Sequence, residues 1–541
     1  MTSTAQASSP GDRVNTSPNV LMIFPKFNAN SYWSMQAVCD IEGRRCLAPP
    51  LGLITLAALL PAAWNIRLIN RNAEELSDAD IDWADLVMTG GMMPQRLDSL
   101  ALIEQCQARG KPVAIGGPDS MSSPDVFTHA DFRVLGEAEG LIEQFIADWS
   151  AGIRSGTYQG EKFQADVTKS PVPRFDLLKL HHYLYVGIQF SRGCPFTCEF
   201  CDIIELYGRV PRAKTNEQVL AELDALYRIG YRGHIDFVDD NLIGNKKALK
   251  RLLPEMIAWQ KARGYPFKFS TEASINLADD TQLLQMMREV KFFALFVGIE
   301  SPDTETLIHT QKKQNTRRSI ADSVHKIYGA GMFVIAGFIV GFDTERGSVA
   351  RLMTEAIAET GIPVAIVGLL TALPNTQLTR RLEKERRLLP LKMNAGDQCT
   401  AGLNFVTLRP RREVLQDFRD VLSEIYHPEP FFQRARLLAR TLDLPHLPAK
   451  FTWGGLHREL RSFARVIWRM MRRGPGDSRH FWGAVIECLR HDYRTLEHVI
   501  TMAAFYLHLA DFTGYVIREV DLQIAQLPKD EPVPLPLPLS A

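Results

Sequence analysis

The stretch Ser191–Ile203 reads SRGCPFTCEFCDI and places Cys194, Cys198 and Cys201 in the spacing C-x3-C-x2-C. It directly follows an apolar run, VGIQF at 186–190, that is typical of a buried β-strand. Three thiolates on one loop can each ligate one iron of a cubane cluster, which leaves the fourth iron open to a small chelating molecule. The loop therefore predicts a 4Fe–4S cluster held by these three cysteines.

A structural zinc site and plain burial of the thiols are the alternatives. Structural zinc takes four ligands, and the nearest histidines, His181 and His182, lie on the far side of the preceding strand. The polar first residues lack the apolar segment of a signal peptide, so we expect a cytoplasmic chain with reduced thiols. Three of its eight cysteines fall within eight residues, which favours a metal cluster over disulfides.

The bulk composition sets few further limits. Lys plus Arg equals Asp plus Glu at 62 each, which gives no reason to expect nucleic-acid binding. No stretch reaches the ~18 uninterrupted apolar residues of a membrane-spanning helix, because the longest, 51–64, is short and contains Pro61.

Apolar runs and helical stretches alternate after the cysteine loop. The segments with helical apolar spacing are 216–229, 246–263, 280–290 and 317–328. The further strand candidates are 234–238, 267–271, 293–300, 333–342 and 364–370. Six consecutive βα units predict a partial (βα)6 barrel over residues 174–385, with its chemistry at the carboxyl ends of the strands.

Residues 18–150 show the same alternation and predict a doubly wound parallel sheet. The expected strands are 20–24, 66–70, 86–90, 112–116 and 132–136. Gly90, Gly116, Gly117 and Gly136, with Glu137, follow these strands directly, at the edge where open α/β sheets bind ligands. Simple tight turns are the other explanation for the glycines.

The barrel motifs together resemble the radical S-adenosylmethionine (SAM) superfamily. The resemblance implies that the open iron binds SAM and that an electron from the cluster cleaves it to a 5′-deoxyadenosyl radical. Phe200 resembles the residue that contacts adenine, and Gly337 and Gly341 in GFIVGF (337–342) resemble the glycine motif beside it. Asp239, Glu272 and Glu300 end later strands, where a ribose diol and an ammonium group favour carboxylates.

The N-terminal part resembles the cobalamin-binding domain of one subgroup of this superfamily. The matching stretches are APPLGLITLAALL (48–60), GGPDS (116–120) and LGEAEG (135–140). The resemblance makes Gly90, Gly116, Gly117, Gly136 and Glu137 candidate cobalamin contacts. The loop PKFNANSYW (25–33) has no histidine, and none occurs before His129, so we expect no histidine ligand to the cobalt. A flavodoxin-like domain without a ligand is the alternative.

The remaining segments divide as follows. Residues 1–17 are predicted to be a disordered leader, 151–173 a linker, 386–530 a helical domain and 531–541 a proline-rich tail. The clearest helices of that domain are predicted at 412–426, 456–473 and 487–519. The fold class is therefore α/β: a parallel-sheet domain, then a partial barrel, then a mainly helical region.

The helix predicted at 456–473 is basic and amphipathic. Its apolar face carries Leu456, Leu460, Phe463, Ile467 and Met470, and its basic face carries Arg458, Arg461, Arg465, Arg469 and Arg472. Such a helix either lies at a membrane surface or docks on the protein core. We keep both, so peripheral contact with the inner membrane surface stays open.

The pattern as a whole resembles the group that contains the bacterial hopanoid 2-methylases. It includes FPKFNANSYW (24–33), CDIIELYGR (201–209) and QCTAGLNF (398–405). The resemblance implies methyl transfer from methylcobalamin to an unactivated lipid carbon, at position 2 of a hopanoid, with an electron donor such as flavodoxin or ferredoxin. A radical SAM cyclase or rearrangement enzyme without methyl transfer, and a non-catalytic cobalamin and cluster sensor, are the alternatives.

Overall fold

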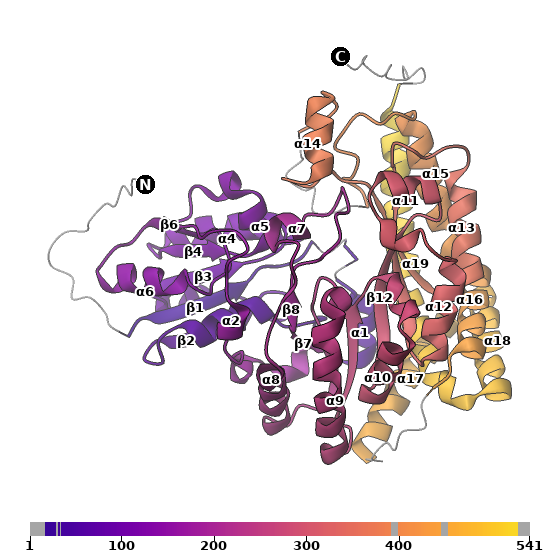
Figure 1. Cartoon of the computed structure of the whole chain (residues 1–541), viewed down its shortest axis with the longest axis horizontal. Helices are drawn as coiled ribbons and strands as arrows, with labels where there is room; N and C mark the ends of the chain where they lie inside the picture. Colours follow the sequence, from indigo (N-terminus) through magenta and orange to yellow (C-terminus); the bar gives the residue numbers. More distant parts are fainter. Residues whose placement is uncertain (1–16, 29–30, 33, 391–398, 445–452, 529–541) are drawn as a thin grey trace.

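The computed structural model describes residues 17–28, 31–32, 34–390, 399–444 and 453–528. Two six-stranded sheets stand side by side, and long helices pack against the second sheet (Figure 1). The predicted α/β fold class is confirmed. The tail expected at 531–541, and all but Ser17 of the expected leader, lie outside the described residues.

The N-terminal sheet is entirely parallel, in the order β2-β1-β3-β4-β5-β6. Its strands are β1 (Asn19–Phe24), β2 (Asn65–Asn70), β3 (Leu86–Gly90), β4 (Val113–Gly116), β5 (Phe132–Val134) and β6 (Gly156–Tyr158). Its helices are α1 (Gln36–Glu42), α2 (Leu51–Leu59), α3 (Asp78–Trp83), α4 (Arg96–Ala108), α5 (Pro118–Ser122) and α6 (Ile142–Ser150). The order reverses between β1 and β3, and such a switch point is where doubly wound sheets hold ligands.

Both faces of this sheet are covered. Helices α2 and α6 share one apolar core with Val20 and Met22 of β1, whereas α3 and α4 share another with Leu21 and Ile23. Side chains alternate across a strand, so a strand buried on both faces is a continuous apolar run. This explains why the sequence VLMIF predicted the strand.

The segment 151–173, expected to be a linker, contributes strand β6. Gly156 pairs with Phe132 of β5, and Tyr158 pairs with Val134. The Tyr158 hydroxyl donates to Asp148 at 3.0 Å, and its ring packs against Phe145. One buried aromatic residue in a polar, Gly-containing run gives too little periodic signal to predict a strand. The domain boundaries themselves stay predictions.

The second sheet curves into an open barrel in the order β14-β13-β12-β11-β10-β7, all parallel. Its strands are β7 (Val186–Ile188), β10 (Gly233–Phe237), β11 (Phe267–Glu272), β12 (Phe292–Glu300), β13 (Phe333–Val340) and β14 (Val364–Leu369). The connecting helices are α8 (Asn216–Arg228), α9 (Lys246–Arg263), α10 (Thr281–Val290), α11 (Thr304–His309), α12 (Ile320–Gly329) and α13 (Val349–Thr360), with α14 (Gln377–Lys384) after β14. All six strands lie where the apolar runs predicted them.

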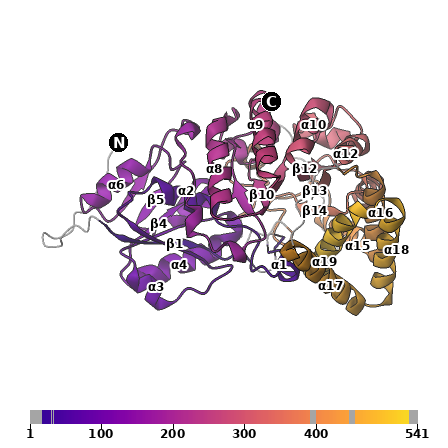
Figure 2. The same ribbon diagram turned by 90° about the horizontal axis from the view of Figure 1, so that it is seen from below.

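The C-terminal region is helical, as expected, and packs against the barrel (Figure 2). Its helices are α15 (Arg411–Ile425), α16 (Pro428–Thr441), α17 (Trp453–Arg473), α18 (Pro475–His491) and α19 (Leu496–Gln526). The single helix predicted at 487–519 is wrong, because the chain turns at residues 492–495 and divides it into α18 and α19. Asp492 accepts the Arg494 backbone N–H at 3.0 Å and so starts a new helical turn.

The basic helix α17 is docked on α1 of the N-terminal part. Arg465 donates to the backbone oxygen of Ile41 at 2.7 Å, and Arg469 donates to that of Ala37 at 3.2 Å. Arg465 binds a carbonyl in the last turn of α1, where a cation also opposes the helix dipole. Two of the five predicted basic-face arginines are therefore used inside the protein. The side chains of Leu456 and Arg458 lie outside the described residues.

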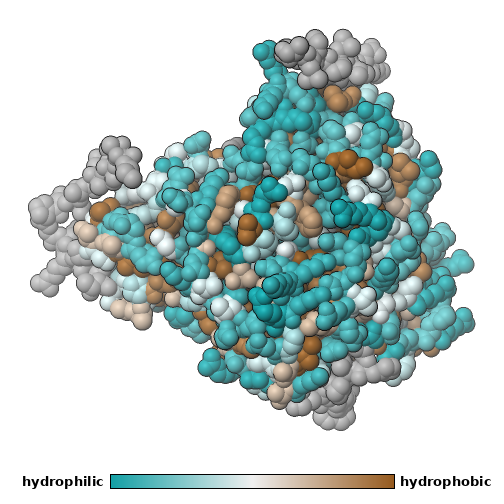
Figure 3. Space-filling view, viewed as in Figure 1, coloured by the Kyte–Doolittle hydropathy of each residue, from teal (hydrophilic) through white to brown (hydrophobic). Residues whose placement is uncertain are grey.

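One helix in the described part of the chain, Tyr493–Gln526, is long and apolar enough to span a membrane, and half of its apolar window is buried inside the protein. Charged residues are scattered along this helix, which explains why its sequence has no uninterrupted apolar stretch. The face in Figure 3 is largely hydrophilic, with scattered apolar residues.

Candidate functional site

The cysteine loop is closed by a short antiparallel ladder and anchored to the barrel. Strand β8 (Ser191–Arg192) pairs with β9 (Arg212–Ala213), and the three cysteines lie between them. Asp239, just after β10, accepts the backbone N–H of Phe190 at 2.8 Å and the Ser191 hydroxyl at 2.7 Å. Burial raises the pKa of Asp239 to about 7 against these hydrogen bonds. Its carboxylate holds the loop in place.

The surroundings of the thiols suit a cluster. Asn241 donates to Cys194 Sγ at 3.8 Å and Gln314 to Cys198 Sγ at 3.6 Å, which are the hydrogen bonds that tune cluster sulfurs. Burial raises the pKa of Cys194 and that of Cys201 above the ordinary thiol value, so a bound metal must favour the thiolates. The described residues include no group of three ligands that converge on a single ion. A cubane needs no such convergence, because each thiolate binds a different iron.

A lysine that the sequence analysis missed lies beside the loop. Lys312 Nζ is 2.6 Å from Glu300 Oε1 and 6.0 Å from the centre of the Phe200 ring. Burial opposes its charge, yet Glu300 and the nearby thiols raise the Lys312 pKa. Glu300 has φ 68°, a backbone conformation that is strained for a side chain with a Cβ. A Cβ on Gly298 would overlap the Glu300 carboxylate, so both residues shape this wall.

Two further carboxyls face the interior at the strand ends. Asp240 accepts the Gly193 N–H at 3.1 Å, and burial raises its pKa to about 6. Burial, followed by the charges of Asp236, Asp240 and Asp239, raises the pKa of Glu272 to about 8. Of the two adjacent aspartates, Asp240 lines the cavity and Asp239 does not.

The glycines of the barrel motif differ in position. Gly337 lines the cavity, where an added Cβ would lie 3.1 Å from the Phe296 ring. Gly341, with φ 115°, instead packs against Leu403 and donates its N–H to Glu345 at 3.0 Å. Gly341 is not among the residues that line the cavity.

The predicted cobalamin residues gather at the carboxyl edge of the N-terminal sheet. Gly90, Gly116, Gly117, Gly136 and Glu137 all line the cavity. A Cβ on Gly90 would lie 2.6 Å from the Gly116 oxygen, so the turns themselves require glycine there. The cavity-lining histidines of the described chain are His234 and His498, both outside this sheet. The residues that line the cavity at this sheet edge thus provide no imidazole for the cobalt.

A buried arginine joins the two sheets. Arg192, in the cysteine loop, donates to Glu137 at 3.0 Å and to Glu139 at 2.9 and 2.8 Å. Arg212 also binds Glu137, at 2.7 Å. Although burial opposes ionisation, Arg192 holds the pKa of Glu139 at about 2. The Glu137 carboxylate is therefore part of an interdomain ion-pair network.

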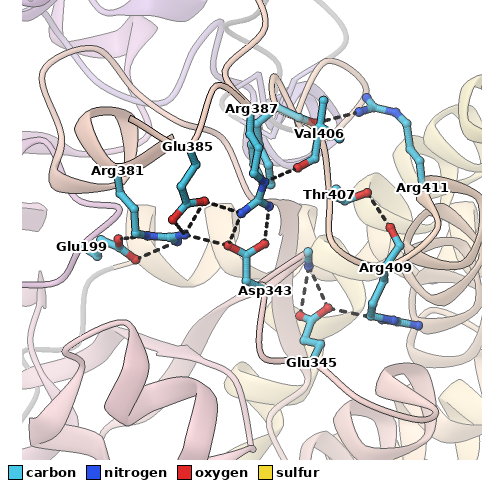
Figure 4. Close-up of polar contacts among 12 residues, drawn as sticks. Glu199, Asp343, Glu345, Arg381, Glu385, Arg387, Val406, Thr407, Arg409 and Arg411 are labelled. Atoms are coloured by element: carbon cyan, nitrogen blue, oxygen red, sulfur yellow. Dashed lines mark hydrogen bonds and ion pairs between the residues drawn. The ribbon is translucent and has the colours of Figure 1, made fainter. Parts of the chain in front are cut away.

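A second network connects the loop to the end of β13 (Figure 4). Arg381 of α14 binds Glu199, between Cys198 and Cys201, at 2.5 Å and Asp343 at 2.8 Å. Arg387 binds Asp343 as well, at 2.5 Å. Charge-assisted bonds of this kind fix geometry, and here they set the cluster loop against the glycine motif.

One continuous cavity of about 1690 Å³ connects these parts. It extends from the N-terminal sheet edge at Gly116, past Phe200 and Glu300, and through the barrel to His498 of α19. Leu460 and Phe463 of α17, and Cys399, also line it. Ordinary single-ligand pockets have roughly 300–1,000 Å³, so this cavity has room for several molecules, and its lining is mainly apolar.

Comparisons with known proteins agree with this geometry. Residues 188–356 match the radical SAM superfamily, and residues 376–521 match a domain of unknown function (DUF4070). The chain is 42% identical to the uncharacterized methyltransferase sll1242 of Synechocystis sp., over 93% of this chain and 94% of that protein. It is 33% identical to the hopanoid C-2 methylase of Rhodopseudomonas palustris, over 90% and 93%.

Solved structures share the fold. The cobalamin-dependent SAM radical enzyme OxsB, with aqua-cobalamin and SAM bound, matches with a TM-score of 0.57 at 15% identity, over 94% of this chain and 81% of that chain. The radical SAM methyltransferase TsrM from Kitasatospora setae, with cobalamin and a [4Fe–4S] cluster bound, matches with 0.54 at 14% identity, over 69% and 80%.

The chain is therefore a radical SAM enzyme. Within that superfamily it belongs to the methyltransferase family that includes the Synechocystis protein and hopanoid C-2 methylase. The predictions of a radical SAM methyltransferase, and of a 4Fe–4S cluster, SAM and cobalamin as the cofactors, are confirmed at the level of this family. The individual site residues stay predictions.

The Arg192 network generates a first prediction. Arg192→Gln leaves Glu139 without its arginine partner and Glu137 with Arg212 alone, and breaking a buried ion pair typically costs about 3–5 kcal/mol. We expect backbone amide exchange in 134–140 and 190–194 to rise at least fivefold, measured by mass spectrometry. Arg174→Gln is the control, because it breaks an exposed pair with Asp176. Equal exchange in the wild type and Arg192→Gln would show that the pair does not hold the sheets together.

Glu272 generates a second prediction. Its unfolded pKa is about 4.3, so between pH ~4.3 and 8 the folded state keeps a proton that the unfolded state has lost, and stability falls as pH rises. Glu272→Gln does not titrate. The melting-temperature advantage of this variant over the wild type should widen from pH 5 to pH 8 and then level off. Glu359→Gln, on the exposed side of α13, should show no such trend, and a constant difference for Glu272→Gln would contradict the raised pKa.

Proposed function

We propose that this chain is a cobalamin-dependent radical SAM methyltransferase that adds a methyl group to an unactivated carbon of a lipid, at position 2 of a hopanoid. The observation that carries the proposal is the shared cavity, since the glycine edge of the first sheet and the cysteine loop of the barrel open into the same space. The relative that methylates hopanoids at C-2, at 33% identity, supports the substrate.

Each group of residues has a defined part in this proposal. When bound, the cluster and SAM supply a hydrogen-abstracting radical, and cobalamin supplies the methyl group. Cys194, Cys198 and Cys201 hold the cluster, and Phe200, Glu272, Glu300 and Gly337 contact SAM from the cavity wall. Asp239 and Gly341 position these elements from outside the cavity. Gly90, Gly116, Gly117 and Gly136 form the cobalamin edge, and Glu137 holds that edge to the cluster loop.

The protein's own contribution is to position the reactants and exclude water. Apolar side chains such as Phe296, Ile335 and Ile339 line part of the lumen, where they can hold an apolar substrate away from water. The reaction needs electrons from outside, and we propose flavodoxin or ferredoxin as the donor.

The third prediction tests the chemistry. Anaerobically reconstituted protein with a hopanoid substrate should form S-adenosylhomocysteine and 5′-deoxyadenosine in equal amounts, one of each per methylated product. Cys198→Ala should lose the cluster, and deoxyadenosine formation should fall at least a hundredfold, while Cys106→Ala, far from the loop on α4, should keep both. Lipid mass spectrometry of cells with and without the gene identifies the product. Deoxyadenosine without S-adenosylhomocysteine would favour the non-methylating alternative.

We also propose that the enzyme works in the cytoplasm and meets its lipid at the inner membrane surface through α17. Trp468 and Met471 are 57% and 61% exposed on this helix, and Arg461 and Arg472 are exposed beside them. Basic residues near an anionic surface contribute ~1 kcal/mol each.

The fourth prediction follows from these exposed residues. Wild-type protein should float with anionic liposomes at low salt, and the attraction should weaken at high salt because charges are screened. Arg461→Glu with Arg472→Glu should reduce flotation at least fivefold, whereas Arg440→Glu on α16 should not. Arg465 and Arg469 are left intact because they hold α1. Equal flotation of all three proteins would exclude α17 as the contact.

A further inference from the structure

The lumen of the barrel has two unlike walls. Strands β10 and β11 present mainly polar side chains to the cavity, and strands β12, β13 and β14 present apolar ones apart from Glu300 at the carboxyl end of β12. The polar wall includes His234, Asp236, Lys268, Ser270 and Glu272. The apolar wall consists of Phe293, Phe296, Ile335, Ile339 and Ile366. Among the barrel strands, the hydrogen-bonding groups below the carboxyl edge thus lie on the side of β10 and β11.

Three residues of the polar wall form a hydrogen-bonded chain. The Ser270 hydroxyl donates to Asp236, and His234 Nε2 lies 2.6 Å from Ser270 Oγ. The Ser270 hydroxyl has one hydrogen, and it donates this hydrogen to Asp236 in a hydrogen bond. Nε2–H of His234 then donates to the serine oxygen, and His234 Nδ1 is left as an acceptor. The chain thus offers acceptor atoms to a donor in the cavity.

These hydrogen-bonded side chains lie below the edge where the cofactors are expected. Asp236 faces Ser270 in the register of β10 and β11, and His234 faces Lys268. At ~3.3 Å per residue, His234 lies about 13 Å from Val238 at the carboxyl end of β10. Abstraction of hydrogen and transfer of a methyl group consume no side-chain proton. The chain is therefore available to bind substrate.

The charge state of the wall narrows the class of ligand. Burial and the neighbouring Lys268 lower the pKa of His234 to about 3, and burial raises the pKa of Asp236. Lys268 is paired with Glu497 of α19 at 3.1 Å. The imidazole is therefore neutral and the lysine is paired, so the acceptor atoms of the wall suit a donor such as a hydroxyl group better than a phosphate.

We infer that the substrate is an elongated molecule with an apolar body and a hydroxyl group, and that His234, Ser270 and Asp236 bind this hydroxyl about 7 Å or more from the carbon that is methylated. This inference rests on the proposed function and narrows its substrate class. A pure hydrocarbon would leave the remaining acceptor atoms of this wall without a donor, and a site built to bind a hydroxyl discriminates strongly against an analogue that lacks it.

The fifth prediction compares two probes in the reconstituted holoenzyme. They are a pentacyclic triterpene alcohol and the matching alkene without the hydroxyl. The wild type should prefer the alcohol at least tenfold in kcat/KM, and should bind it at least tenfold more tightly in equilibrium dialysis without SAM. Ser270→Ala should bring both ratios close to one and leave kcat/KM for the alkene within twofold of the wild type. His234→Phe, which keeps a ring, should do the same.

Ser323→Ala is the matched control, because Ser323 is a buried serine on α12 whose hydroxyl donates to the Ser319 oxygen at 2.8 Å. It should keep the preference for the alcohol. Equal use of alcohol and alkene by the wild type, or a preference that survives Ser270→Ala, would overturn the inference while methyl transfer itself stands. No methyl transfer to either probe would instead overturn the proposed lipid substrate, and the inference with it.

Discussion

The geometry of the whole site depends on the largely buried guanidinium of Arg192. It belongs to the cysteine loop, yet it binds two carboxylates of the N-terminal sheet, Glu137 and Glu139. A guanidinium buried in this way is stable only if its N–H groups are hydrogen-bonded. Its planar arrangement of donors also allows only a narrow range of partner positions. The ion pairs therefore set one sheet edge against the other and keep the cavity between them continuous.

Much of the fold was predictable because both sheets are buried on two faces. Strands such as β1 are apolar along almost their whole length, whereas β10 and β11 alternate apolar residues with polar ones that face the cavity. Each predicted strand of the barrel appears at its place. Strand β6 was missed because its pairing with β5, and not its own sequence, makes it a strand. The division between α18 and α19 was missed for a similar reason, since the apolar spacing continues across the turn that Asp492 caps.

The site was predictable only where a local motif carried it. The cysteine spacing and the strand-end carboxylates can be seen in a short window of sequence. Lys312, Arg192 and the Ser270 chain cannot, because their partners lie elsewhere along the sequence. The choice between Asp239 and Asp240 depends on which way each side chain points, and adjacent residues at a strand end point in opposite directions. The arginines of α17 show the same limit: their helical spacing was visible, but not that Arg465 and Arg469 bind α1.

A six-stranded open barrel leaves two edge strands and a gap between them, and unpaired edges are a liability. Here both edges are covered by distant parts of the chain. Leu184, just before β7, donates its N–H to the Cys46 oxygen at 3.1 Å. On the other edge, the Tyr426 hydroxyl donates to Ala365 of β14 at 2.8 Å, and Tyr32 donates to Val367 at 3.3 Å.

The Tyr32 ring also packs on Phe512 of α19, with the ring centres 4.6 Å apart. The N-terminal segment and the C-terminal helices thus complete the wall that the barrel lacks. Three regions that differ in sequence pattern consequently enclose one cavity, and removing any one of them would open the lumen to water.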